Sequence, residues 1–169
     1  MARPTDRSTE LERALAANAA YAERFYGSGL TASPARGLAV VACMDARLTI
    51  EDLLGLRTGD AHLIRNAGGL ATDDAIRSLV ISQHILGTRE IFVIEHTGCG
   101  MLNFEDEPVR RRIAATQGAS VDLPLLPFSD LEANLVRQVD RIRAHPWIMD
   151  VPVHGLIYDV ETGRLRLVV

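Results

Sequence analysis

The chain has 169 residues, with 18 Lys+Arg against 22 Asp+Glu for a formal net charge of -4, and 47% of its residues are hydrophobic. This length is typical of one domain that folds without a disulfide framework, and the acidic excess argues against a nucleic-acid partner. No stretch approaches the roughly 18 apolar residues of a membrane span, so the sequence predicts a soluble protein with no membrane partner.

The first predicted element is a helix from about Thr9 to Tyr26. Thr9 lies three residues before Glu12, which is the spacing of a capping box, and apolar residues follow at helical intervals. Glycine and proline between Gly27 and Gly37 interrupt regular structure. We therefore expect a single domain over 1–169, with an N-terminal helical arm and linker over 1–36 and an α/β core over 37–169.

Short apolar runs at 38–42, 61–64 and 91–94 predict buried strands, the second less clearly than the others. A helix capped by Thr72 is predicted to end at Gly87, and a second helix follows the capping-box spacing from Ser129 to Glu132 and ends before Pro146. The apolar residues of 156–160 and 165–168, separated by a turn, predict a terminal pair of strands.

This alternation of strands and helices predicts an α/β fold. We expect a mostly parallel central β-sheet flanked by helices, with an N-terminal helix and an antiparallel C-terminal edge strand. Ligands of such sheets bind beyond the carboxyl ends of the strands. The segments Cys43 to Arg47 and His96 to Gly100 follow two of the predicted strands, and both carry reactive side chains.

Cys43, His96 and Cys99 are residues of the kind that bind metals. Two thiolates and an imidazole suit Zn²⁺, and three protein ligands leave a fourth position open, as in catalytic zinc sites. Asp45 could close the site as a fourth ligand, which would make the zinc structural, or it could accept a hydrogen bond from bound water. Arg47 favours the second arrangement, because a bidentate guanidinium would hold the Asp45 carboxylate off the metal.

Other interpretations of the cysteines are weaker. Two buried cysteines are usually small apolar residues, but here a histidine and an Asp-x-Arg pair accompany them. A dithiol redox site is disfavoured because no Cys-x-x-Cys occurs. With two distant cysteines and no signal-peptide pattern, we expect a reducing, cytoplasmic compartment.

Three segments together resemble the signature segments of the β-class carbonic anhydrases: Cys43 to Arg47, Arg65 to Gly68, and His96 to Gly100. The resemblance implies zinc on Cys43, His96 and Cys99, a catalytic dyad of Asp45 with Arg47, and a homodimer or homotetramer. Met44 stands where many relatives carry serine, and Gly69 where many carry asparagine. The chain also lacks the longer arm and insertions of many relatives, so it resembles the shorter, less typical branch.

The leading hypothesis is zinc-dependent reversible hydration of carbon dioxide to bicarbonate and a proton by a zinc-bound hydroxide. The first alternative is hydrolysis of carbon disulfide or carbonyl sulfide at the same site, an activity known in related proteins of the shorter branch. The second is a non-catalytic regulatory protein that binds zinc or bicarbonate. Because two thiolates cancel the charge of zinc, we expect activity to favour alkaline pH.

The remaining candidates receive structural interpretations. The other histidines have no ligand-like spacing to a cysteine, so we expect surface or hydrogen-bonded core positions for His62, His84, His145 and His154. Arg110 to Arg112 follow three acidic residues and predict a solvated charged face. The segment Arg65 to Gly69 predicts a turn that needs glycine and that supports the site through backbone amides.

Overall fold

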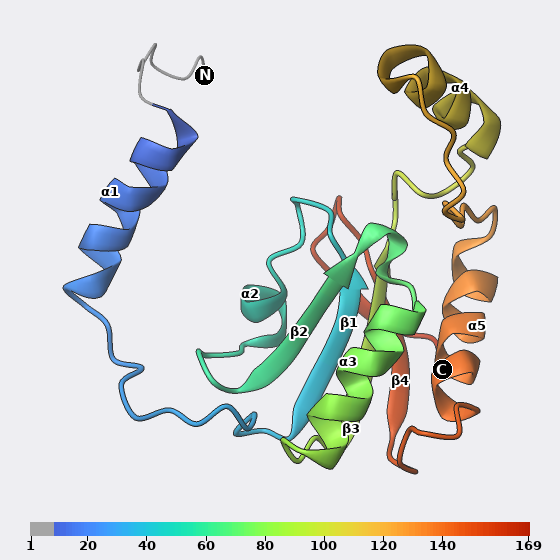
Figure 1. The fold of residues 1–169 in the computed structure, drawn as a ribbon. Coiled ribbons are helices and arrows are strands. Elements are labelled where there is room, and N and C mark those ends of the chain that lie inside the picture. Colours follow the sequence, from blue (N-terminus) through green and yellow to red (C-terminus); the bar gives the residue numbers. More distant parts are fainter. Residues whose placement is uncertain (1–8) are drawn as a thin grey trace. The chain divides into compact units, whose positions relative to one another are not determined.

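The computed structural model describes residues 9–169. The described chain divides into two compact units, one ending at Leu30 and one comprising residues Thr31–Val169 (Figure 1). The elements in chain order are α1 (Glu10–Ala22), β1 (Leu38–Cys43), α2 (Ile50–Leu54), β2 (Ala61–Asn66), the 3-10 helix η1 (Ala67–Gly69), α3 (Asp73–His84), β3 (Glu90–His96), α4 (Asp106–Gln117), α5 (Leu131–Arg143), β4 (Val153–Tyr158) and β5 (Leu165–Leu167).

The larger unit is built on a five-stranded sheet with the order β2-β1-β3-β4-β5. β1 pairs in parallel with β2 and β3, β3 pairs in parallel with β4, and β5 runs antiparallel to β4 at the edge. The predicted α/β fold with its antiparallel C-terminal edge strand is therefore confirmed. Since the parallel strands point the same way, the ends of β1 and β3 lie together at one edge of the sheet (Figure 1).

Two apolar clusters cover the two faces of the sheet. The first joins β1 and β3 to the helices α3 and α5, through residues such as Val41, Val93 and Leu135. The second includes alternate residues of the same strands together with Leu48, Ile50 and Phe128, and it contains both Cys43 and Cys99. Every residue of β1 is buried, as its continuous apolar run predicts, whereas β2 at the edge is half-buried. The two thiols therefore lie in a packed, apolar region at the strand ends.

The helix boundaries differ from the prediction in three places, one of which is the end of α3 at His84 rather than at Gly87. α1 has the expected capping box between Thr9 and Glu12 but ends at Ala22 rather than Tyr26, where the chain turns through an i→i+3 bond from Phe25 N–H to Ala22 O. The N-cap of α5 is Asp130, not Ser129, because the Asp130 carboxylate accepts from Ala133 N–H. Thr72 caps α3 as predicted, through a hydrogen bond from Ala75 N–H.

α4 was not predicted as a helix, because it has no apolar stripe and buries none of its residues. Its ion pairs link residues one turn apart, Arg110 with Asp106 and Arg111 with Glu107, so the charged face expected of the arginine run lies on a helix that was not expected. Among residues 9–169, none of the helices combines the length and the apolar composition needed to cross a bilayer.

Candidate metal centre

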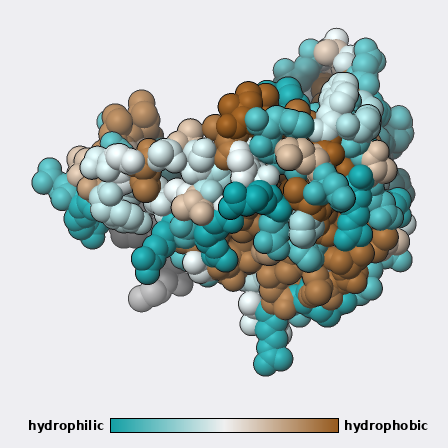
Figure 2. All heavy atoms as spheres, turned by 90° about the horizontal axis from the view of Figure 1, so that it is seen from below, coloured by the Kyte–Doolittle hydropathy of each residue, from teal (hydrophilic) through white to brown (hydrophobic). Residues whose placement is uncertain are grey.

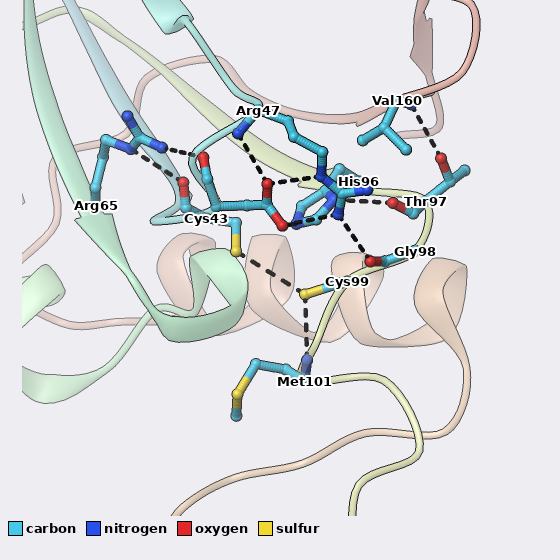
Figure 3. A network of polar contacts seen from close by, with 10 residues as sticks. Cys43, Arg47, Arg65, His96, Thr97, Gly98, Cys99, Met101 and Val160 are labelled. Carbon is cyan, nitrogen blue, oxygen red and sulfur yellow. Dashed lines mark hydrogen bonds and ion pairs between the residues drawn. The ribbon is translucent and has the colours of Figure 1, made fainter. Parts of the chain in front are cut away.

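Cys43, His96 and Cys99 converge where β1 and β3 end (Figure 3). Cys43 is the last residue of β1, His96 is the last residue of β3, and Cys99 lies in the loop that follows. All three side chains are buried, and their potential ligand atoms lie within 4.8 Å of one another. The fold therefore brings Cys43 beside His96 and Cys99, which follow it by more than fifty positions in the sequence.

The distances and hydrogen bonds of this group fit a tetrahedral zinc ion. The sulfur atoms of Cys43 and Cys99 are 3.9 Å apart, close to the ~3.8 Å expected of two sulfurs bound 2.3 Å from one tetrahedral ion. The Nδ1 atom of His96 lies 2.9 Å from Thr97 O, which can only accept, so Nδ1 carries the ring proton. The Nε2 atom of His96 is buried and has no hydrogen-bond partner, so its lone pair is available to a metal.

The electrostatics of the group also favour a cation. The hydrogen bond between the two sulfurs lowers the pKa of Cys43 and raises that of Cys99, so a single thiolate forms readily in the metal-free chain. Burial acts to lower the pKa of His96, but the adjacent Cys43 thiolate and the hydrogen bond to Thr97 O outweigh burial, and the pKa is raised. Positive charge is thus stabilised at the point where the three donor atoms meet.

Asp45 lies beside the group and is held by Arg47. Arg47 Nε donates to Asp45 Oδ1 at 2.9 Å, Arg47 Nη2 donates to Oδ2 at 2.8 Å, and the Arg47 backbone N–H also donates to Oδ1 at 2.9 Å. The hydrogen bonds from Arg47 hold the pKa of Asp45 well below its usual range. Asp45 Oδ2 is 3.7 Å from His96 Nε2, too far for a hydrogen bond but adjacent to the donor atoms.

Arg47 makes a further contact that the sequence did not indicate. Its Nη2 atom donates to the carbonyl oxygen of Gly98 at 3.0 Å, in the loop that carries Cys99 (Figure 3). One guanidinium therefore links the two segments that contribute cysteines.

The segment Arg65 to Gly69 supports the site in part through a backbone amide, as the sequence suggested, because the Gly68 backbone hydrogen-bonds to the Cys43 thiol and helps to lower its pKa. A further contribution comes from the Arg65 side chain, which donates to backbone carbonyls of the Cys43 segment, and from the close packing of Gly69. Gly69 has φ +69°, and a Cβ at this position would lie 2.9 Å from both Cys43 N and Ile94 O. Only glycine fits here, because the atoms it would meet belong to β1 and β3.

Glu95 is a buried carboxyl that the sequence did not single out. It precedes His96 on β3, and its Oε1 atom accepts from Asn134 Nδ2 of α5 at 2.7 Å, while Oε2 has no hydrogen-bond partner. Burial raises the pKa of Glu95 to about 8, although the bond from Asn134 acts in the opposite direction. Glu95 is notable because it is buried. The sequence pattern of an interior strand such as β3 does not show that a charged residue in it is buried.

This raised pKa predicts a pH-dependent stability. Since the folded state binds the Glu95 proton more tightly than the unfolded state, with its ordinary pKa of 4.5, the contribution to stability is complete below about pH 4.5 and is lost as the pH rises to about 8. In Glu95→Gln, the loss of stability across this window should be smaller by up to ~1.4 kcal/mol per pH unit. Denaturant unfolding of metal-free wild type and variant at a series of pH values measures the free energy of unfolding. Parallel dependences of this free energy on pH in the two proteins would contradict the prediction.

All four of the other histidines have hydrogen-bond or ionic partners elsewhere, as expected, and His145 Nδ1 accepts from Trp147 N–H at 3.3 Å. His62 Nδ1 lies 2.7 Å from Ser82 Oγ, His84 Nε2 lies 2.9 Å from Trp147 O, and His154 Nε2 lies 3.3 Å from Glu90 Oε1. Within the described part of the chain, His96 is the one histidine of the candidate metal group.

Comparison with known proteins gives one consistent family. The sequence model of the family described as Carbonic anhydrase matches residues 38–165. Beta-carbonic anhydrase 1 of Mycobacterium tuberculosis is 43% identical over 153 residues, covering 90% of this chain and 93% of that protein. A carbon disulfide hydrolase of Acidithiobacillus thiooxidans is 41% identical over 155 residues, covering 78% of this chain and 76% of that protein.

Solved structures agree with the sequence comparison. The crystal structure of carbonic anhydrase from Streptococcus mutans is similar with a TM-score of 0.91 and 39% identity, covering 97% of this chain and all of that one. The family match spans most of the chain, and the buried Cys43, His96 and Cys99 lie within it. The chain therefore belongs to the β-class carbonic anhydrase family.

Proposed function

We propose that this chain catalyses the zinc-dependent reversible hydration of carbon dioxide to bicarbonate and a proton. The observation that carries the proposal is the buried group of Cys43, His96 and Cys99, with the ionised Asp45 carboxylate fixed beside it. The mycobacterial carbonic anhydrase, similar over nearly its whole length, supports the same activity.

In this proposal Cys43, His96 and Cys99 hold the metal. Bound zinc supplies a Lewis acid that lowers the pKa of a water molecule and so provides the nucleophile at moderate pH. His96 contributes its unpartnered Nε2 lone pair, and the bond from Nδ1 to Thr97 O fixes the orientation of the ring.

Asp45 has the role of orienting the reactants. Because the hydrogen bonds from Arg47 keep its pKa low, the Asp45 carboxylate stays ionised at neutral pH and can only accept hydrogen bonds. With Oδ1 held by two donors of Arg47 and Oδ2 by a third, the carboxylate has one orientation relative to His96. A fixed acceptor at this place aligns the hydrogen of the nucleophile, and such alignment accelerates a reaction without proton transfer to the carboxylate.

A second candidate substrate is carbon disulfide or carbonyl sulfide. The 41% identity to a carbon disulfide hydrolase favours it, but that relative is matched over 76% of its length, against 93% for the mycobacterial carbonic anhydrase. A third candidate is a regulatory protein in which Asp45 stays on the metal. The bidentate bond of Asp45 to Arg47 argues against this state.

The deciding experiment is a stopped-flow assay of carbon dioxide hydration by zinc-loaded protein from pH 7 to pH 9, with parallel assays of sulfide release from carbon disulfide and carbonyl sulfide. We expect hydration activity that rises with pH, because two thiolates reduce the charge that acidifies water. Asp45→Asn should lower it strongly, whereas Asp74→Asn, in a surface ion pair with Arg77, should leave it unchanged. Fully loaded protein that never exceeds the uncatalysed rate would refute the proposal.

We also propose that the chain assembles as a homodimer or homotetramer through α1. This helix has an apolar composition on one side, yet none of its residues is buried, and Leu11 and Leu15 are exposed. The core unit also carries exposed apolar side chains, and Figure 2 shows hydrophobic atoms gathered on the face where the parallel strands begin. Apolar surfaces of this kind are typical of interfaces between subunits.

The assembly is tested by light scattering. The wild-type chain should have at least twice the monomer mass, and Leu11→Ser with Leu15→Ser should reduce that mass, because serine removes the apolar contact without adding charge. Glu23→Gln, just beyond the helix, is the matched control and should keep the wild-type mass. A wild-type monomer at assay concentration would contradict the assembly.

A further inference from the structure

The side chain of Arg65 crosses from the edge strand β2 to the end of β1. Its Nε atom donates to the carbonyl oxygen of Cys43 at 3.0 Å, and its Nη2 atom donates to the carbonyl oxygen of Asp45 at 2.7 Å (Figure 3). These two carbonyls flank Met44 in the segment that joins the first cysteine to the carboxylate. In the described part of the chain, no carboxylate forms an ion pair with Arg65, so its charge is directed at these carbonyls.

We propose that Arg65 is a positioning residue, which fixes the backbone from Cys43 to Asp45 and thereby sets the Cys43 sulfur and the Asp45 carboxylate in their relation to the metal position. The effect on turnover rests on the proposed hydration activity, whereas the effect on metal binding does not. Arg65 acts through the backbone of other residues and touches none of the reacting atoms.

The need for such a restraint follows from where β1 ends. The β1–β2 ladder stops at the pair Cys43 and Asn66, and the Met44 N–H makes the next bond, to Asn66 O at 2.8 Å. Beyond it the chain turns toward Leu48, and the side chain of Met44 is 65% exposed, so burial does not anchor the middle of the segment. The bonds from Arg65 hold the backbone on both sides of this exposed residue.

The geometry requires arginine rather than a cation in general. The guanidinium is a rigid planar group whose Nε and Nη2 donors point in one plane, so it can bridge two carbonyls two residues apart. A lysine ammonium is a compact charge on a flexible stem and cannot hold both carbonyls in fixed directions. Arg47 restrains a different part of the site, since it bonds the Asp45 side chain and Gly98 O. The carboxylate is thus fixed from its side chain by Arg47 and from its backbone by Arg65.

The experiment compares Arg65→Lys and Arg65→Gln with wild type, and Arg77→Gln serves as a control for loss of an exposed arginine. Three quantities are measured: the rate of zinc transfer to a chelator, the visible spectrum of the cobalt(II)-substituted protein, and carbon dioxide hydration. Thermal unfolding of the metal-free proteins monitors the fold.

We expect zinc release from both Arg65 variants to be about 10-fold to 100-fold faster, as for other residues that orient metal ligands. The cobalt spectrum should change, kcat should fall with KM little affected, and Arg65→Lys should not restore wild-type values. A wild-type rate of zinc release and a wild-type cobalt spectrum in Arg65→Lys would overturn the proposal. If Arg65→Gln does not fold, the same measurements on Arg65→Lys alone decide whether Arg65 is a positioning residue. If wild type lacks hydration activity, the proposed function fails, but release and spectra still test Arg65.

Discussion

Replacement of Cys99 by serine should lower zinc affinity by more than ~100-fold, the upper range for changes that only orient a metal ligand, and should reduce hydration activity to background. The reason lies in the ligand chemistry, because a neutral hydroxyl is a poor substitute for a thiolate on zinc. The geometry supports this loss of affinity, because the Cys99 sulfur lies 3.9 Å from the Cys43 sulfur and both side chains are buried, as two ligands of one ion would be. With one sulfur removed, two ligands remain to hold the ion.

Metal analysis after dialysis against a weak chelator measures the effect. Cys43→Ser should behave in the same way, because its sulfur occupies the equivalent position at the end of β1. The matched control is Thr97→Ser in the same loop, which keeps the hydroxyl that accepts from Val160 N–H and should retain zinc. Full zinc content in both cysteine variants would refute the assignment of the metal group.

Arg47→Ala should reduce activity by ~10²-fold to 10⁴-fold, the range expected when a reacting group loses its orientation and its hydrogen-bonding partner. Without the guanidinium, Asp45 Oδ2 loses its bond to Arg47 Nη2 and is free to move the short distance toward the metal group. A carboxylate is a good zinc ligand, so we expect Asp45 to become the fourth protein ligand. The pKa of Asp45 should also rise toward its ordinary value, because the bonds from Arg47 are what lower it.

X-ray absorption of zinc-loaded Arg47→Ala at pH 7 and above pH 8 reports the ligands directly. The double variant Arg47→Ala with Asp45→Asn is the control, since a neutral amide competes poorly for zinc and the fourth ligand should then come from solvent. If Asp45 were only a general base, Arg47→Ala would keep a solvent ligand at both pH values and lose activity modestly. A retained solvent ligand with retained activity would mean that Arg47 does not control access of Asp45 to the metal.

The sequence predicts those parts of the fold that depend on local patterns. β1 follows from an uninterrupted apolar run because a central parallel strand is buried on both faces, and the caps at Thr9 and Thr72 follow from side chains that bond their own helix. α4 has no apolar stripe, and α2 has only five residues, so neither produces a periodic signal.

The site divides in the same way. The sequence reveals the residues whose types and spacing within two short segments indicate metal chemistry. These are Cys43, Asp45 and Arg47 in the first segment and His96 and Cys99 in the second. The role of Arg65 depends on the register that places β2 beside β1, and the contact between Glu95 and Asn134 joins residues 39 positions apart. No short-range pattern encodes either contact, since each arises from the packing of distant elements.

The separation of Cys43 and Cys99 along the chain has a consequence for folding. The two sulfurs are 56 residues apart in sequence, so an ion shared between them cross-links the ends of a loop that contains β2, α3 and β3. By polymer statistics, closing a loop of this size removes conformational entropy from the unfolded chain equivalent to about 4 kcal/mol. An ion bound there would act as a removable cross-link, so the abundance of folded protein would depend on the zinc concentration of its surroundings.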